Sequence, residues 1–242
     1  MTVADLKLLV LAGGFGTRLQ SALPDTPKAL APVGDGPFLA LQLEHWIAQG
    51  VRSFVLLLHH QAGQIVDFLR GARGGLLKDC EVRHVIEPTP LDTGGAVAYA
   101  VRQLGLDGDI LIANADSWFG SGIRELGASR APAMVVTHLD NCARYGQVRF
   151  GDGGRVTAFI EKNGLAEPGW INAGLYRLNA GTFAGWDGGR LSLERQLFPD
   201  LVRQAALQAV PIRADFIDIG IPEDYRRFCR WAGDGKVSRL CS

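Results

Sequence analysis

The chain has 242 residues, of which 47% are hydrophobic and 21% charged, a composition typical of folded globular proteins and not of disordered chains. Its length suits one large domain or two small ones. The 25 basic and 25 acidic residues give zero net charge, which argues against a nucleic-acid-binding surface but still allows a small anionic ligand.

The first half of the chain alternates apolar runs of strand length with helical patterns. Residues 7–11, apolar after Lys7, form a run that ends at Ala12, Gly13 and Gly14, as expected of a buried parallel strand that enters a loop. The same patterns predict strands over residues 53–58, 82–86 and 109–113, and helices over residues 37–49, around 65–69 and over 94–104. This alternation favours a mostly parallel sheet with helices on both faces.

The second half is richer in hairpin signals. Residues 147–150 and 155–160 flank the turn sequence Gly151-Asp152-Gly153-Gly154, a strong hairpin pattern. Further strands are predicted over residues 133–139, 171–178 and 216–219, and a last helix over residues 222–231. No Pro- or Ser-rich linker and no repeat divides the chain, so we predict a single α/β domain, residues 1–242, with a Rossmann-like mixed sheet.

The cysteines, the N-terminus and the apolar runs argue against a zinc site, a disulfide framework, a signal peptide and a membrane helix. Cys80, Cys142, Cys229 and Cys241 are scattered and form no CxxC pair, so neither a zinc site nor a disulfide framework is expected. The N-terminus has no basic region followed by an apolar stretch. The longest apolar runs fall far short of the roughly 20 residues that a membrane helix needs. We expect a cytoplasmic protein with reduced thiols.

The loop after the first strand carries the clearest chemical signal. Gly13, Gly14 and Gly16 let the backbone approach a ligand and expose N–H groups to phosphate oxygens. Arg18 offers a forked donor and Lys28 a point charge, the two ways in which side chains neutralise phosphate. Glycines after a strand are often mere turns, but these cations favour a phosphate-binding loop. A P-loop and a dinucleotide GxGxxG motif both fail on spacing.

The loop, read as GGFGTRL followed by Pro-Lys, resembles the activating loop of the sugar-phosphate nucleotidyltransferase family, G-G-x-G-x-R-L followed by P-K. Later family motifs match in order: PLDTGGA at residues 90–96, NAD at 114–116, RYG at 144–146, FIEK at 159–162, NAG at 172–174 and DIGIPED at 218–224. Residues 171–176 and 216–225 are especially similar to D-glycero-α-D-manno-heptose 1-phosphate guanylyltransferases of bacterial capsule and surface-polysaccharide synthesis. The resemblance therefore covers nearly the whole chain.

The resemblance implies a GT-A-like fold with a nucleotide-binding half (about residues 1–130) and a sugar-phosphate-binding half (about 131–242). The implied nucleotide-binding residues are Leu11, Ala12, Gly13, Gly14, Gly16, Thr17, Arg18, Glu87, Thr93, Gly94, Gly95, Asn114 and Asp116. The implied sugar-phosphate-binding residues are Lys28, Tyr145, Gly146, Glu161, Lys162, Asn172 and Gly174. The catalytic residues would be Arg18, Lys28, Asp116 and Lys162.

Two carboxylates are candidate ligands of Mg²⁺, the one cofactor that we expect. Asp116 ends a buried strand and Asp218 follows an apolar pair, settings in which a charged residue is usually paired or metal-bound. Mg²⁺ is commonly held by one or two carboxylates together with substrate phosphates. The two positions lie far apart in sequence, and only the resemblance brings them together; taken alone, each could be a turn-capping residue.

The expected reaction is transfer of GMP from GTP to D-glycero-α-D-manno-heptose 1-phosphate, with release of pyrophosphate. A phosphate monoester, with a second pKa of about 6, is already mostly dianionic at pH 7, so no Ser-His-Asp or Cys-His set is needed. The expected partners are GTP and a sugar 1-phosphate, without nucleic acid or membrane, and the resemblance also allows for a homodimer. Asp92 stands where relatives frequently have glycine, a change that bears on contacts with the base or ribose.

Four alternatives remain open. The first is a uridylyltransferase or cytidylyltransferase that acts on another sugar 1-phosphate. The second is a catalytically silent regulator that binds nucleotide-sugars, which intact Arg18, Lys28, Asp116 and Asp218 argue against. The third is a nucleotide-sugar-dependent glycosyltransferase, for which a D-x-D motif would be expected. The fourth is a Rossmann dehydrogenase, which the missing third glycine disfavours.

Overall fold

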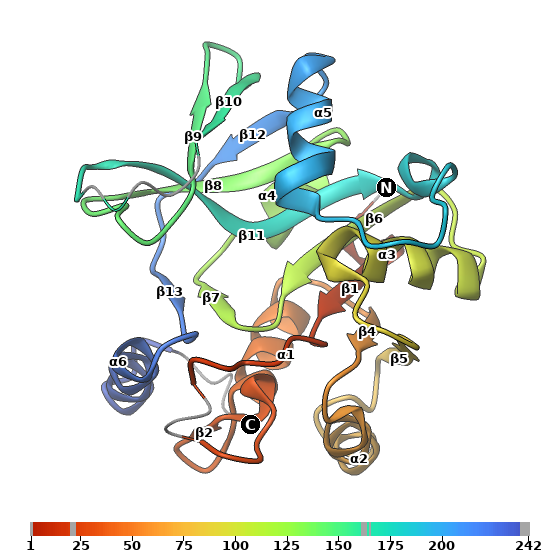
Figure 1. Cartoon of the computed structure of the whole chain (residues 1–242). Helices are drawn as coiled ribbons and strands as arrows, with labels where there is room; N and C mark the ends of the chain where they lie inside the picture. The colour runs from red at the N-terminus through yellow and green to blue at the C-terminus, as the bar shows by residue number, and fades with distance from the viewer. Residues whose placement is uncertain (1, 20–22, 161–163, 165, 238–242) are drawn as a thin grey trace.

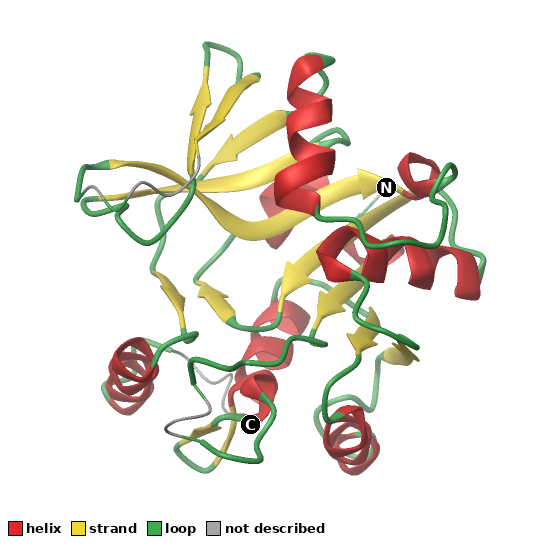
Figure 2. Ribbon diagram, in the orientation of Figure 1, coloured by secondary structure: helices red, strands yellow, loops and turns green. Residues whose placement is uncertain are grey.

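A mixed nine-stranded sheet forms the centre of the computed structural model, which describes residues 2–19, 23–160, 164 and 166–237 (Figures 1 and 2). Within these residues, the strands of the sheet are β1 (Lys7–Leu11), β4 (Ser53–Leu58), β5 (Glu81–Ile86), β6 (Asp109–Asn114), β8 (Ala133–Leu139), β9 (Gln147–Phe150), β10 (Val156–Ile160), β11 (Gly169–Asn179) and β12 (Gln208–Pro211). Two small ribbons pair β2 (Pro32–Val33) with β3 (Gly36–Pro37) and β7 (Ser117–Phe119) with β13 (Phe216–Asp218).

Helices flank this sheet. The α-helices are α1 (Phe38–Ala48), α2 (Ala62–Ala72), α3 (Asp92–Leu104), α4 (Ile123–Ala128), α5 (Phe198–Arg203) and α6 (Pro222–Gly233). Short 3₁₀ turns are η1 (Val3–Asp5), η2 (Lys28–Leu30) and η3 (Ala180–Phe183), and a π-helical turn, η4 (Leu193–Leu197), runs directly into α5.

Alternation along β1 explains why both faces of the sheet are covered. Leu8 and Val10 pack into a core with α1, α2 and α4, whereas Leu9 packs into a second core with α3 and α5. All three side chains are fully buried, and each contributes about 2 kcal/mol of hydrophobic stabilisation. A buried parallel strand needs apolar residues on both sides, which is why this segment is a continuous apolar run.

The strand order places the loops after β1 and β6 at one edge of the sheet. Strands β5, β4, β1 and β6 are parallel neighbours, and Leu11 at the end of β1 pairs with Leu57 on one side and Asn114 on the other. The ladder continues for one residue, because the Ala12 N–H donates to Leu57 O and the Ala115 N–H to Leu11 O. The loops after β1 and β6 therefore leave the sheet side by side.

The predicted fold class is confirmed: one α/β domain with a mixed sheet and helices on both faces. Each strand and helix predicted from the sequence is present, with ends that shift by a few residues. Several short elements were not predicted, namely β2, β3, β7, α4, the η4–α5 segment and β12. They are short, and all except β7 carry glycine or proline. Pro211 stands in β12, an edge strand, where proline is tolerated.

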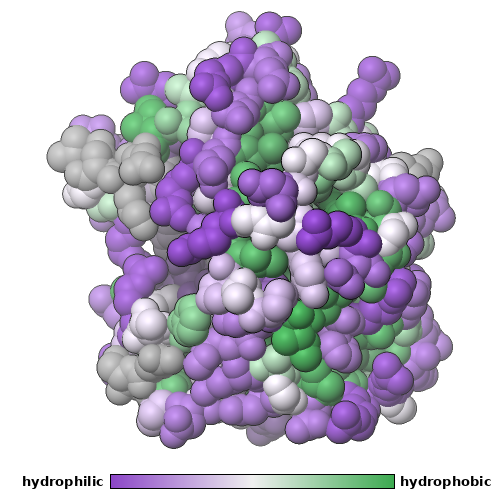
Figure 3. Space-filling view, turned by 45° about the vertical axis from the view of Figure 1, so that its right-hand side comes forward, coloured by the Kyte–Doolittle hydropathy of each residue, from purple (hydrophilic) through white to green (hydrophobic). Residues whose placement is uncertain are grey.

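Large apolar side chains are mostly buried among the described residues. Hydrophilic residues dominate the face shown in Figure 3, and hydrophobic residues form limited groups between them. Among the described residues, Phe15 and Ile86 are the large hydrophobic side chains that stand out as exposed, at 47% and 49%. No helix in the described part of the chain has the length and apolar character needed to cross a bilayer.

Candidate active site

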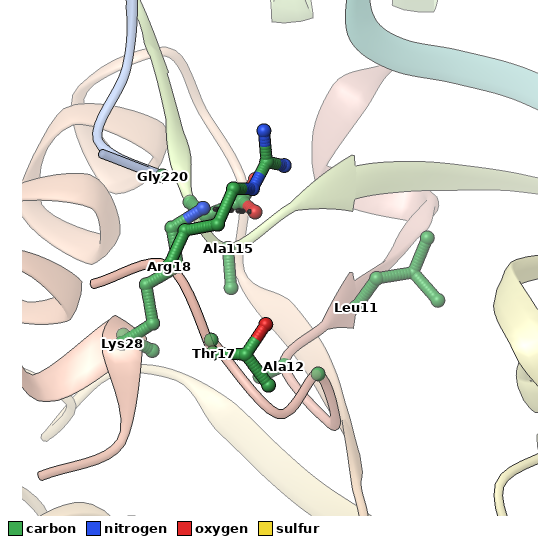
Figure 4. A pocket seen from close by; sticks show the side chains of 11 residues that line it. Leu11, Ala12, Thr17, Arg18, Lys28, Ala115 and Gly220 are labelled. Atoms are coloured by element: carbon green, nitrogen blue, oxygen red, sulfur yellow. Dashed lines mark hydrogen bonds and ion pairs between the residues drawn. The ribbon is translucent and has the colours of Figure 1, made fainter. Parts of the chain in front are cut away.

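A cavity of about 200 Å³ opens where the loops after β1 and β6 leave the sheet (Figure 4). The glycine-rich loop supplies Gly14, Gly16 and Arg18, η2 supplies Lys28, and the turn after β6 supplies Asp116. Figure 4 shows Arg18 and Lys28 reaching toward this same cavity. Gly16 has a φ of +61°, so the loop requires glycine there, and a Cβ would lie 3.2 Å from Lys28 Cβ.

Lys28 joins two carboxylates that are distant in sequence. Its Nζ lies 2.7 Å from Asp116 Oδ2 and 3.2 Å from Asp218 Oδ1. The β7–β13 ribbon brings these carboxylates together, since Asp218 pairs with Ser117 and the Ile219 N–H donates to the Asp116 carbonyl. The candidate metal ligands thus converge on one point.

The charges of this triad perturb one another. Burial alone would lower the pKa of Lys28, but the two adjacent carboxylates outweigh burial and raise it. Burial would raise the pKa of Asp116, yet the Lys28 ammonium holds it below its usual value. Asp218 has a raised pKa because burial and the neighbouring Asp116 charge together exceed the help from Lys28. The site therefore keeps its lysine charged at neutral pH.

The carboxylate pair has the donor chemistry of a magnesium site that substrate completes. The described residues contain no cluster of three or more His, Cys, Asp and Glu side chains around a single point. Two carboxylates with phosphate oxygens as further ligands suit Mg²⁺, which keeps several non-protein ligands. The Gly220 N–H donates to Asp218 Oδ1 at 2.6 Å and the Ser117 hydroxyl to Asp116 Oδ1, so both carboxylates are oriented by neighbours.

A second cavity, of about 470 Å³, adjoins the first and shares Leu11, Gly14 and Asp116 with it. Glu87 lies in its wall, is buried, and accepts the Leu91 N–H at 2.9 Å on Oε2. Burial raises the pKa of this carboxyl, although the Leu91 hydrogen bond opposes the effect. A Cβ on Gly13 would lie 3.2 Å from Glu87 Oε1 and 3.1 Å from the backbone of His59, so glycine permits a tight approach here.

The start of α3 is packed by the protein itself. The Gly95 N–H donates to Leu191 O, and a Cβ on Gly94 would lie 2.9 Å from Leu191 Cγ. Thr93 lines the second cavity, whereas these two glycines pack closely against the segment before η4. Their implied contact with a nucleotide stays a prediction, and close packing is a physical reason for glycine at both positions.

The residues predicted on the sugar side form a second group. Asn172 Oδ1 accepts the Gly174 N–H at 2.9 Å, in a part of β11 where the pairing register with β8 shifts. Gly174 has a φ of +77°, and a Cβ there would lie 2.8 Å from Asn114 Nδ2, which brings this turn beside the end of β6. The Tyr145 ring packs against Phe216, and burial raises the pKa of its hydroxyl to about 12.

Gly146 follows Tyr145, close to the end of β10, where a Cβ would lie 3.4 Å from Ile160 O. Glu161 and Lys162 come directly after that strand and lie outside the described residues. Their predicted contacts with the sugar phosphate therefore stay predictions.

Two arginines of the second cavity were given no role by the sequence. Arg190 and Arg195 both line it, and both form ion pairs with Asp92. They follow Asp92 by about a hundred positions in the printed sequence, and no local pattern distinguishes them from the other exposed arginines. Both arginines reach the second cavity because η4 and the residues before it pack against the start of α3.

Comparison with known proteins gives concordant matches. A Campylobacter jejuni subsp. jejuni protein named D-glycero-alpha-D-manno-heptose 1-phosphate guanylyltransferase is 28% identical over 224 residues, covering 92% of this chain and 98% of the relative. Mannose-1-phosphate guanylyltransferase 1 of Arabidopsis thaliana is 31% identical over 229 residues, covering 91% of this chain and 63% of that longer protein.

The crystal structure of HddC from Yersinia pseudotuberculosis superposes with a TM-score of 0.81 at 30% sequence identity, covering 93% of this chain and 98% of that one. The same protein complexed with GMP-PN superposes with a TM-score of 0.79. The Nucleotidyl transferase family matches residues 7–230. The resemblance found in the sequence motifs is confirmed, and the chain belongs to the nucleotidyl transferase family.

Proposed function

We propose that the protein transfers GMP from GTP to a sugar 1-phosphate, D-glycero-α-D-manno-heptose 1-phosphate by preference, and releases pyrophosphate. The observation that carries the proposal is the position of Lys28, which lines the first cavity and whose ammonium lies between Asp116 and Asp218. A fixed positive charge between two phosphates favours their joining, and the position of this lysine supports that role.

The residues around the first cavity suit positioning and charge stabilisation. Backbone amides of Gly14 and Gly16 would cradle the triphosphate, and Arg18 would contact the departing pyrophosphate. A sugar-phosphate oxygen would attack the α-phosphorus in line, forming one P–O bond as the bond to the β-phosphate bridging oxygen breaks. Lys28 would contact the α-phosphate and the incoming phosphate, with Lys162 as a further predicted cation.

Mg²⁺ is the proposed cofactor, held by Asp116 and Asp218. Bound there, it would supply Lewis-acid stabilisation of phosphate charge. The two carboxylates are close enough to share one cation, since the Lys28 ammonium contacts both of them, at 2.7 and 3.2 Å. The neighbouring amide and hydroxyl donors fix their orientation, as supporting groups around a metal site commonly do.

Guanine is the proposed base. A carboxylate accepts hydrogen bonds, and guanine presents two adjacent donors, N1–H and the 2-amino group, whereas adenine, uracil and cytosine do not. Glu87 lies in the wall of the second cavity with Oε1 close to Gly13, which supports a contact with that edge. The names of both relatives, guanylyltransferases for a heptose and for mannose, support the same base.

The sugar is proposed from the relatives, because the groups that would contact it are polar but not distinctive. The Campylobacter heptose guanylyltransferase matches over 98% of its length, which favours the heptose phosphate. Mannose 1-phosphate is the second candidate, since the plant mannose enzyme is 31% identical. Tyr145, Gly146, Asn172 and Gly174 would line this side of the site.

A substrate panel tests the proposal. Pyrophosphate release would be measured with GTP, UTP, CTP, ATP and dTTP, each combined with heptose, mannose and glucose 1-phosphates, with Mg²⁺ and with EDTA. We expect release with GTP and the heptose phosphate that EDTA abolishes. Release with another pair would overturn the substrate assignment, and silence across the panel from a folded, nucleotide-binding protein would favour a regulatory role.

A further inference from the structure

Two guanidinium groups lie at the rim of the second cavity, and a single carboxylate holds both. Arg195 Nη2 lies 2.5 Å from Asp92 Oδ2, and Arg190 Nη2 lies 3.7 Å from the same oxygen. The Asp92 side chain is 19% exposed, whereas the two arginine side chains are 65% and 72% exposed. The carboxylate is thus set into the wall, and the guanidinium groups keep donors available to the cavity.

The backbone fixes Asp92 in an unfavourable conformation. Its φ is +66°, in the left-handed region that residues other than glycine rarely adopt. Oδ1 accepts the Thr93 N–H at 2.8 Å, which leaves Oδ2 for the arginines. Such strain persists only where the surrounding structure over-determines it, and it gathers at ligand-binding positions.

Contacts between η4 and the start of α3 hold Arg195 in place. The Thr93 hydroxyl donates to Glu194 Oε2 at 2.8 Å and accepts the Leu193 N–H at 2.9 Å. The residue before Arg195 and the residue after Asp92 are therefore bonded to each other, so the position of Arg195 relative to α3 is not left to the ion pair alone. A guanidinium fixed in this way is suited to recognising a ligand edge.

The polar groups of this cavity are complementary to guanine at two edges. Glu87 offers a carboxylate beside Gly13, and the arginines offer forked donors; apolar residues such as Leu91 also line the cavity. Guanine has donors at N1 and N2 and two adjacent acceptors, O6 and N7, and an arginine fork is the commonest partner of that acceptor pair. Adenine places an amino donor beside N7, and pyrimidines have no N7.

We propose that Arg195, positioned by Asp92, is a specificity-determining residue that donates hydrogen bonds to O6 and N7 of the guanine base, with Arg190 as a second donor at the rim. This inference rests on the proposed function, because it requires the base of the nucleotide to occupy the second cavity.

The test compares GTP with 7-deaza-GTP, which lacks the N7 acceptor. Values of kcat/KM for pyrophosphate release would be measured for the wild type, Arg195→Ala and the control Arg203→Ala. Arg203 is an arginine of similar exposure, 74% against 65% for Arg195, and it pairs with Asp200 on α5. We expect the wild type and the control to prefer GTP about tenfold. Arg195→Ala should lose about that factor with GTP and treat the two nucleotides alike.

A second variant separates recognition from folding. Asp92→Gly removes the carboxylate at a backbone position that glycine adopts freely. Its GTP to 7-deaza-GTP ratio should fall, but less than in Arg195→Ala, because the contacts of Thr93 with Glu194 and Leu193 still hold η4 in place. Retention of the wild-type ratio in Arg195→Ala and Asp92→Gly would overturn the inference while leaving the proposed function intact. Absence of activity with GTP in the wild type would overturn the proposed function and this inference with it.

Discussion

Lys28 forms ion pairs with one carboxylate from the first half of the chain, Asp116, and one from the second half, Asp218. It belongs to the front half, and its two carboxylate partners lie after β6 and in β13. We predict that Lys28→Ala lowers turnover by a factor of about 10² or more, because the cation between two phosphates is lost. Pyrophosphate release under saturating substrate measures the effect.

A matched control is Lys78→Ala, which removes an exposed lysine between α2 and β5. Its turnover should equal that of the wild type. Circular dichroism would check that both variants are folded, since removing Lys28 leaves two carboxylates without their partner. Near wild-type turnover in a folded Lys28→Ala protein would remove this residue from the mechanism.

Glu87 shows a conflict between stability and binding. Burial raises the pKa of its carboxyl, so the ionised carboxylate destabilises the folded protein at pH values above that pKa. Glu87→Gln keeps an acceptor for the Leu91 N–H and removes that cost. We predict a higher midpoint of thermal unfolding at pH 7, a gain that vanishes as the pH falls below the carboxyl's pKa.

The same variant should lower kcat/KM for GTP about tenfold, because an amide nitrogen cannot accept hydrogen bonds from guanine. Thermal melts at several pH values and the pyrophosphate assay measure the two effects together. A variant that is less stable at pH 7 and as active with GTP as the wild type would contradict this account of Glu87.

At the scale of elements, the docking of the η4 segment onto α3 shapes the second cavity. Gly94 has no room for a side chain, since a Cβ would lie 2.9 Å from Leu191 Cγ and 3.0 Å from Leu191 O. We predict that Gly94→Ala lowers the free energy of unfolding by about 1–3 kcal/mol. Gly71→Ala on α2, where no atom lies within 4 Å of the added Cβ, should be neutral or stabilising by up to about 1 kcal/mol.

Urea unfolding of the two glycine variants and the wild type checks this prediction. Equal stability of Gly94→Ala and Gly71→Ala would show that the contact with Leu191 yields without cost. In that event the close packing of the two elements could not explain the glycine pair at the start of α3.

The sequence predicted the elements whose burial is uniform. A strand such as β4 is apolar along its length because both faces are covered, and the hairpin of β9 and β10 is marked by its turn residues. Pairings between distant segments left no local trace. Asp116 and Asp218 come together because β7 pairs with β13. The ion pair between Asp92 and Arg195 likewise depends on the position of the η4 turn, which carries Arg195.

The glycine-rich loop was recognisable because three glycines and two cations stand close together in sequence, and the structure places Gly14, Gly16, Arg18 and Lys28 around one cavity. Local pattern could not distinguish two physical reasons for glycine. Gly16 adopts a positive φ that other residues rarely tolerate, whereas Gly94 leaves room for Leu191 to pack against α3. That distinction needs the neighbour in space.

At the scale of the whole molecule, the parallel strands place two adjoining cavities along the carboxyl edge of one sheet, with Asp116 in the wall of both. The smaller cavity is lined by Arg18 and Lys28, and the larger one combines apolar residues with Glu87 and two arginines. This pair of cavities suits a phosphate chain joined to a nucleoside. The proposed activity follows from that continuity, because transfer to the α-phosphorus requires the triphosphate and base to be held by one continuous surface.

The most direct test of this account follows the phosphorus atom itself. The protein would be incubated with Mg²⁺, D-glycero-α-D-manno-heptose 1-phosphate and GTP labelled at the α-phosphorus, and the products separated. We predict label in a GDP-heptose and unlabelled pyrophosphate in equal amounts. Label that stays in GTP, or that appears in free GMP without a nucleotide-sugar, would contradict guanylyl transfer to this sugar phosphate.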